Sequence, residues 1–255
     1  MSGFGLVGFL LLTGFAAYAQ TLTGFAFGLI TMGGVGLSGL LPLPEAAVVV
    51  SLLTLVNAGQ MLLKGWRDVA WREFGLVMVS SLPAVFVGFR LLGWLAAGHA
   101  DVLRLVLGLV IIVSSIQLAR NAEPRGEKSG AASFLFFGVL GGLMGGLFST
   151  AGPPLVYHFY RQPLAQAVVR ETLVTIFALN ALLRLGLVAA APAGPAAILP
   201  GLLAVPAVLG ATYAARRFPP PISKLAMRRL VFILLFLSGV SLGAPAALRL
   251  AGHLA

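Results

Sequence analysis

Apolar residues run in long stretches along almost the whole chain, and short polar loops separate these stretches. A helix needs about 20 apolar residues to cross the hydrocarbon core of a bilayer. The stretches do not alternate between apolar and polar positions, which argues against a transmembrane barrel. Eight main spans are predicted, at residues 4–40, 44–63, 74–96, 102–119, 133–160, 164–190, 196–215 and 226–250. We therefore predict an all-α fold, a polytopic transmembrane helical bundle.

Two of the eight segments do not fit a single straight span. Residues 4–40 are too many for one crossing, and Gly152-Pro153-Pro154 interrupts residues 133–160. A membrane protein keeps such irregular backbone where it is buried in protein or lines a cavity. We predict that the first and fifth segments are broken or re-entrant.

The chain also carries signs of an internal duplication. The strongly polar stretch at residues 121–130 divides it into two similar halves. The helix after Glu45 aligns without a gap with the helix after Gln166, from Ala47 opposite Ala167 to Lys64 opposite Arg184. The predicted units are a first repeat (1–120), a polar cytoplasmic linker (121–132) and a second repeat (133–255). Weak internal symmetry of this kind is typical of transporters, whose substrate sites lie at the repeat interface.

Charge supports a membrane location and leaves the topology open. Only 9% of residues are charged, against about 25% in soluble domains. The net charge of +10 comes from basic residues in short loops, which indicates membrane orientation and argues against nucleic acid. The loops near Lys64 and Arg125 are predicted to be cytoplasmic. The basic loop near Lys224 also favours the cytoplasm. Eight simple crossings would place this loop outside, whereas inverted repeats with broken first and fifth segments would place it in the cytoplasm. Parallel and inverted repeats both stay open.

The second half contains the strongest candidates for binding an anion. Arg170 and Arg184 lie fourteen residues apart on similar faces of one predicted helix, and arginine suits oxyanions. Thr172 and Asn180 lie on the same helix and could donate hydrogen bonds. The alternatives are that Arg184 extends to the membrane interface and that Arg170 pairs with Glu171.

The break itself is the second candidate site. Ser149, Thr150, Gly152 and Pro153 surround a point where one helix ends and another starts. The first N–H groups of a helix and its dipole both favour an anion. The alternative is an ordinary loop punctuated by proline. Two titratable residues near this break, Glu171 and His158, are candidates for proton coupling.

The first half offers polar residues inside apolar stretches. Gln20 and Thr21 lie in the first segment, and Asn57 belongs to a polar stripe with three-residue spacing on the second. We predict that these side chains face the protein interior, where they line a path or bond a neighbouring helix.

An enzyme is a second class of function that the sequence allows. Gly36-Leu37-Ser38-Gly39 matches the short motif of rhomboid intramembrane proteases, with His158 as the available base. The chain has no cysteine, and we predict no cofactor, no metal site and no catalytic residue.

Several motifs, in order, resemble one family of permeases. They are Gly24-Phe25-Ala26-Phe27-Gly28, Leu41-Pro42-Leu43-Pro44-Glu45, Ser149-Thr150-Ala151-Gly152-Pro153-Pro154, Val169-Arg170-Glu171-Thr172 and Asn180-Ala181-Leu182-Leu183-Arg184. With these motifs the chain resembles the TauE/SafE-type sulfite exporters of bacterial membranes over nearly its whole length.

The resemblance implies a secondary transporter in the cell inner membrane that exports sulfite, thiosulfate, sulfoacetate or similar anions. An anion channel is the alternative, and an intramembrane serine hydrolase is a more distant one. The expected partners are a small anionic substrate and the lipid bilayer, with a homodimer left open.

Overall fold

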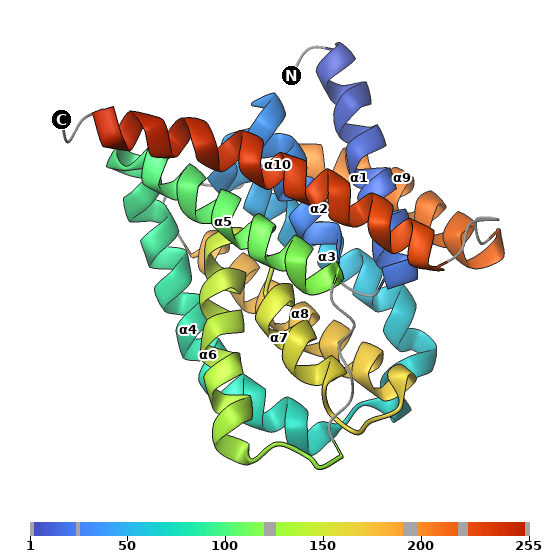
Figure 1. Ribbon diagram of the computed structural model, residues 1–255. Helices are drawn as coiled ribbons and strands as arrows, with labels where there is room; N and C mark the ends of the chain where they lie inside the picture. Colours follow the sequence, from blue (N-terminus) through green and yellow to red (C-terminus); the bar gives the residue numbers. More distant parts are fainter. Residues whose placement is uncertain (1–2, 24–25, 120–125, 191–197, 219–223, 253–255) are drawn as a thin grey trace.

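The computed structural model describes residues 3–23, 26–119, 126–190, 198–218 and 224–252, and within these ranges it contains helices and no strand. The helices are α1 Gly3–Thr23, α2 Phe27–Ser38, α3 Leu43–Gly65, η1 Trp66–Asp68, α4 Trp71–Gly98, α5 Ala100–Ala119, α6 Ala131–Phe148, α7 Gly152–Tyr160, α8 Gln166–Ala189, α9 Ile198–Arg217 and α10 Lys224–Gly252 (Figure 1).

Eight of these helices are long and apolar enough to cross a bilayer, and they correspond to the eight predicted segments. The all-α helical bundle is therefore confirmed. The two segments predicted to be broken each consist of a long helix followed by a short one, α1 with α2 and α6 with α7. Helices of 12 and 9 residues are about 18 and 14 Å long, too short to cross the membrane.

Helices α6 and α7 form a re-entrant hairpin. A Cβ atom built on Gly141 of α6 would lie 2.6 Å from Leu155 of α7, so the two helices run back along each other from the break. Directly after α7, the Gln162 amide donates to the Ser129 hydroxyl, which directly precedes α6, at 3.0 Å. The hairpin therefore enters and leaves the bundle at the same end.

Helices α1 and α2 form the corresponding hairpin in the first half. Gly34 of α2 lies against Leu12 of α1, which pairs the helices in the same antiparallel way. A Cβ on Gly28 of α2 would lie 3.0 Å from the side chain of Thr150 in the second break. The start of α2 therefore touches the second break inside the bundle.

Several loops gather at one end of the molecule, which we call the linker end because residues 126–130 lie there. Lys128 of the linker forms an ion pair of 3.0 Å with Glu73 at the start of α4. The Ala70 N–H, between α3 and α4, donates to the Thr172 hydroxyl near the start of α8 at 2.9 Å. Helix α3 thus ends at the linker end, and α4, α6 and α8 start there.

The central pair of helices, α3 and α8, runs antiparallel. Ser51 of α3 bonds Arg184 of α8, whereas Met61, further along α3, packs near Val174, earlier in α8. These are the two helices that the duplication matches. Equivalent helices point in opposite directions in inverted repeats and in the same direction in parallel ones.

Helices α5 and α10 show the same relation at the edge of the bundle. Asp101 at the start of α5 bonds Arg249 near the end of α10, and Gly108 lies against Gly239 and Gly243. A Cβ on Gly108 would lie 2.8 Å from backbone atoms of α10, so only glycine permits this approach. Two equivalent pairs thus run antiparallel, and this geometry favours the inverted arrangement.

The two halves share one core instead of forming separate bodies. Helix α4 packs along α6 and α1 packs along α9, so the most extensive packing joins different halves (Figure 1). The division at residues 120–133 remains a prediction, as does sidedness. Several basic residues used to predict sidedness lie outside the described residues or side chains: Lys64, Arg120, Arg125, Arg216, Lys224 and Arg228.

The structure shifts the register in which α3 and α8 correspond. The residue before each helix has nearly the same conformation, φ −57° and ψ 142° at Pro42, and φ −59° and ψ 142° at Ala165. Counting from these starts places Asn57 opposite Asn180, an offset of 123, whereas the sequence alignment has an offset of 120. Met61, and not Lys64, is then the counterpart of Arg184.

Candidate anion site at the second helix break

The second break begins with a serine in a left-handed conformation. Ser149 has φ 54°, the only positive φ of a non-glycine residue in the described part of the chain. Its N–H donates to the Gly145 carbonyl at 2.9 Å, which ends α6. Its hydroxyl lies 2.6 Å from the Ser51 hydroxyl of α3. Non-glycine residues persist in such strained conformations mainly where function requires them.

Helix α7 starts one residue earlier than the sequence suggested. Gly152 is its first residue, and Pro153 and Pro154 occupy the next two positions. The prolines have no N–H to offer, so the expected group of several free donors at this helix start is wrong. One helical donor remains, the Gly152 N–H, and it makes no hydrogen bond with the described residues.

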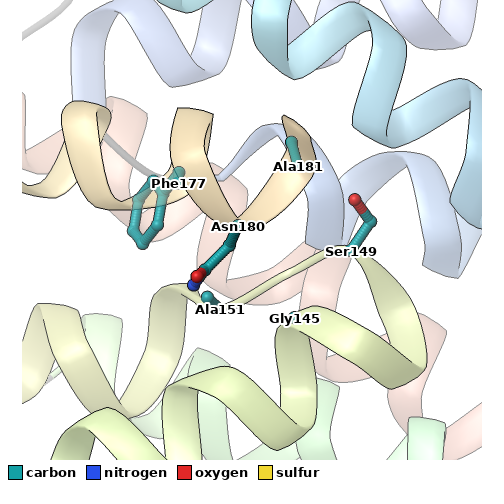
Figure 2. A pocket seen from close by; sticks show the side chains of 6 residues that line it. All are labelled: Gly145, Ser149, Ala151, Phe177, Asn180 and Ala181. Carbon is teal, nitrogen blue, oxygen red and sulfur yellow. The ribbon is translucent and has the colours of Figure 1, made fainter. Parts of the chain in front are cut away.

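A small pocket of about 10 Å³, room for about one water molecule, opens beside this start. It is lined by Gly145, Ser149, Ala151, Phe177, Asn180 and Ala181 (Figure 2). The Asn180 amide points from α8 toward the chain at Ala151. The pocket therefore lies where the break of one hairpin faces the middle of α8.

Asn180 presents an unused donor to this pocket. Its side chain is 4% exposed, and its Oδ1 accepts a hydrogen bond of 3.1 Å from the Ser81 hydroxyl of α4. Its Nδ2 has no partner among the described residues. A buried donor without an acceptor costs about 1–3 kcal/mol, which a bound acceptor would recover.

Arg184 places a positive charge next to the pocket. It is 1% exposed and the largest fully buried side chain in the described part of the chain. Its Nε donates to the Gly146 carbonyl at 3.1 Å, and its Nη1 donates to the Ser51 hydroxyl at 3.4 Å. The guanidinium also lies 5.7 Å from the centre of the Phe89 ring. These contacts hold Arg184 inside the protein, so it does not extend to the interface.

No carboxylate pairs with Arg184 among the residues that the structure describes. A chain of hydrogen bonds links Arg184 to the pocket: the Ser51 hydroxyl bonds both the Arg184 guanidinium and the hydroxyl of Ser149, which lines the pocket. Removing a charge from water without a counter-ion is costly, so this arrangement favours an anion nearby.

Three other predicted residues lie away from the break. Arg170 is 47% exposed and pairs with Glu171: its Nε and Nη2 both donate to Oε1, at 3.0 and 2.9 Å. The second oxygen of Glu171 is buried and has no partner in the described residues. The Thr172 hydroxyl donates to the Val168 carbonyl and accepts from the Ala70 N–H in the loop before α4, so both hydrogen bonds join it to the protein. Proton coupling at Glu171 stays a prediction.

The first-half candidates gather at a different place. Gln20 of α1 bonds Asn57 of α3, which in turn donates to the Thr212 hydroxyl of α9 at 3.1 Å. The Thr21 hydroxyl donates to the carbonyl of Ala17 in its own helix. Thr150 lies at the second break as predicted, and its buried hydroxyl has no partner in the described part of the chain.

The structure gives no support to a serine nucleophile. The Ser38 hydroxyl lies at the exposed end of α2 and donates to the Gly34 carbonyl of the same helix at 2.7 Å. His158 is buried on α7 between the rings of Phe134 and Phe137, each 4.5 Å from its centre.

Sequence reasoning missed four residues that build the site. Ser51 was visible only as part of a polar stripe, and Ser81 as one polar residue in an apolar span. Gly145 and Phe177 gave no signal of their own, because glycine and phenylalanine are common in such helices. Their roles depend on contacts between α3, α4, α6 and α8.

Comparison with known proteins decides the family. The model of the family described as sulfite exporter TauE/SafE matches residues 9–242. The chain belongs to the sulfite exporter TauE/SafE family. This TauE/SafE protein is 38% identical over 247 residues to the "Probable sulfite/organosulfonate exporter TauE" of Cupriavidus necator, and the match covers 94% of each chain. No solved structure matches it significantly.

The family predicted from the sequence motifs is thus confirmed. The TauE/SafE protein is a multi-pass membrane transporter and not an enzyme, which overturns the serine hydrolase alternative. Its family links it to sulfur-containing anions as a class of substrate.

Proposed function

We propose that this TauE/SafE protein is a secondary transporter that exports sulfite or small organosulfonates across the bacterial inner membrane. The observation that carries the proposal is Arg184, a fully buried cation without a carboxylate partner among the described residues, next to a pocket with an unused donor on Asn180. The name of the Cupriavidus necator relative supports the substrate class.

The chemistry of the pocket suits a small oxyanion. Asn180 Nδ2 lines the pocket and has no partner among the described residues. The Gly152 N–H, next along the chain from the lining residue Ala151, has none there either. Hydrogen bonds from such donors to a charged group are worth about 1.5–3 kcal/mol each. In the low dielectric of the bundle, the Arg184 charge adds attraction without direct contact. Phe177 and Ala181 form the apolar side of the pocket, which must widen for an anion to enter, as the movement of one bundle against the other would allow.

The arrangement of the halves suggests how access changes. The pocket lies between the α6–α7 hairpin and α8, close to the contact with α2 of the first half. In transporters with inverted repeats, one bundle moves against the other around a fixed site. The membrane potential drives anions out of a negative interior, at about 2.3 kcal/mol per charge per 100 mV.

The test measures uptake of radiolabelled sulfite and of a labelled organosulfonate by vesicles that contain the purified full chain. The Arg184→Met variant substitutes the residue found at the equivalent position of α3, and it should reduce uptake at least about 10-fold without lowering the thermal unfolding midpoint, since it removes an unpaired buried charge. Arg170→Ala is the matched control and should keep wild-type uptake, because Arg170 is half-exposed and paired outside the pocket.

Two outcomes would contradict this function. One is a wild-type protein that moves neither anion above empty vesicles. The other is an Arg184→Met protein that transports normally. Unlabelled sulfite on the far side should accelerate uptake in a carrier, whereas an anion channel would show no such acceleration.

A further inference from the structure

The first half contains a side chain that caps a broken helix from within the bundle. The Phe27 N–H, the first of α2, donates to Oε1 of Gln20 at 3.0 Å. The other end of the same carboxamide donates from Nε2 to Oδ1 of Asn57 at 3.4 Å. Gln20 is buried, so its amide fills the space between the start of α2 and the middle of α3.

The two hairpins can be matched residue by residue at their breaks. The residue before α2 is Ala26, with φ −77° and ψ −12°, and the residue before α7 is Ala151, with φ −71° and ψ −2°. An offset of 125 therefore relates the hairpins. It places Gln20 opposite Gly145. The Phe27 N–H, which Gln20 caps, corresponds to the Gly152 N–H at the start of α7.

The central helices agree with this match. Counted from their starts, Asn57 of α3 corresponds to Asn180 of α8. Each asparagine bonds a hydroxyl on a helix of the other half: Asn57 Nδ2 donates to Thr212 of α9, and Asn180 Oδ1 accepts from Ser81 of α4. Asn57 therefore turns its oxygen toward the break, and Asn180 turns its Nδ2. Gln20 and Asn57 of the first half thus correspond to Gly145 and Asn180 of the second half.

The missing side chain at Gly145 explains why a pocket exists in the second half. A Cβ built on Gly145 would lie 3.7 Å from Asn180 Nδ2, so a longer side chain there would extend beside this amide, as Gln20 does beside Asn57. Gly145 and Asn180 both line the pocket. Asn180 Nδ2 remains unused in the pocket, and the Gly152 N–H, directly after the lining residue Ala151, has no partner among the described residues.

We propose that the Gln20 carboxamide occupies, in the first half, the place that the transported anion occupies in the second. This inference rests on the proposed function and adds three statements to it. One oxygen of the anion accepts hydrogen bonds from the Gly152 N–H and from Asn180 Nδ2. The part of the ligand that enters is a terminal oxyanion group close in size to a carboxamide, such as sulfite or the head of a sulfonate.

The third statement is that each chain binds a single anion. The first-half site is permanently filled by Gln20, and its counterpart of Arg184 is the uncharged Met61. The first half therefore contains an equivalent site that cannot bind an anion, because the Gln20 side chain fills it.

The variant Gly145→Gln tests the inference because it places a carboxamide at the position that corresponds to Gln20, where its oxygen can accept from Asn180 Nδ2 and the Gly152 N–H. A Cβ at this position meets its nearest neighbour at 3.4 Å, an ordinary packing distance, so the substitution fits at its base. Calorimetry on the full chain in detergent should find one sulfite per wild-type chain. Gly145→Gln should bind sulfite more than about 100-fold more weakly, since its amide takes both donors, and should unfold at or above the wild-type temperature.

Gly98→Gln is the matched control, because it adds the same side chain at the exposed end of α4, where a Cβ meets nothing within 4 Å, and it should keep wild-type binding. If Gly145→Gln folds and binds sulfite like the wild type, the inference is wrong while the proposed function stands. If the wild type binds no sulfur oxyanion, the proposed function fails first.

A second measurement does not depend on the folding of any variant. Saturating sulfite should slow hydrogen exchange of wild-type peptides that cover residues 149–152, where the Gly152 N–H lies. It should leave exchange at the start of α2 unchanged, because Gln20 already occupies that donor. Protection at the start of α2 in place of residues 149–152 would overturn the inference.

Discussion

Only one of the two polar atoms of the Asn180 side chain is hydrogen-bonded within the described residues, so substitution of this residue tests the pocket directly. Its Oδ1 is satisfied by Ser81, whereas its Nδ2 faces the pocket without a partner in the described residues. Asn180→Leu, which keeps the size of the side chain, should weaken sulfite binding about 10- to 100-fold through loss of a charge-assisted hydrogen bond. Titration calorimetry would measure the change.

Ser81→Ala is the control for this prediction. It removes only the hydroxyl that orients the Asn180 amide, so its effect on binding should be smaller than that of Asn180→Leu. Equal affinity in Asn180→Leu and the wild type would exclude Asn180 from the site.

Single residues could be predicted from the sequence only in part. Arg170 and Arg184 lie on similar faces of one helix, and spacing alone does not rank them. Gly146 and Ser51, on other helices, bond Arg184, whereas Arg170 pairs with its neighbour Glu171 on α8. Residue type and position along a span therefore indicated candidates, but burial against distant segments separated them.

At the scale of elements, the glycines of α6 determine how closely α4 can approach. A Cβ on Gly146 would lie 2.2 Å from the Val85 carbonyl oxygen of α4, whereas one on Gly145 meets nothing closer than 3.4 Å. Gly146→Ala should therefore lower stability by about 1–3 kcal/mol or more through overpacking, while Gly145→Ala should not. Thermal unfolding of both variants in the same detergent gives the comparison, and equal midpoints would contradict the packing.

The elements themselves were largely predictable. The lengths of the apolar stretches predicted the eight segments. The excess length of the first segment and the Gly-Pro-Pro sequence in the fifth predicted the two breaks. The sequence left open whether the fifth segment is merely broken or re-entrant, because the return of α7 depends on Gln162 bonding Ser129 across 33 residues of sequence. Local pattern determines where helices form, and long-range hydrogen bonds determine how they fold back.

At the scale of the whole molecule, the antiparallel pairing of equivalent helices predicts the sidedness of the loops. If α2 and α7 are both re-entrant, Glu127 and Arg217 lie on one side of the membrane and Ser38 on the other. The chain has no native cysteine, so single cysteines at these exposed positions can be labelled by an impermeant thiol reagent. Labelling of positions 127 and 217 from opposite sides would contradict the inverted arrangement.

The sequence predicted a duplication, but it did not determine the register of the two halves. Apolar helices align with one another at several offsets, since leucine, valine and alanine recur throughout. The matching starts of α3 and α8 and the hydrogen bonds of Asn57 and Asn180 define the correspondence in space. This register reveals that the two halves differ chemically, with the unpaired charge and the open pocket both in the second.

The most direct test of the account is to locate the anion in the protein. Selenite has the charge and the pyramidal shape of sulfite, and its selenium can be identified by anomalous scattering in crystals of the full chain. The account predicts one site per chain, bounded by Asn180, Gly152 and Ser149, with an oxygen about 2.7–3.2 Å from Asn180 Nδ2. A selenium atom beside Gln20 or Arg170, or an empty pocket at saturating selenite, would contradict it.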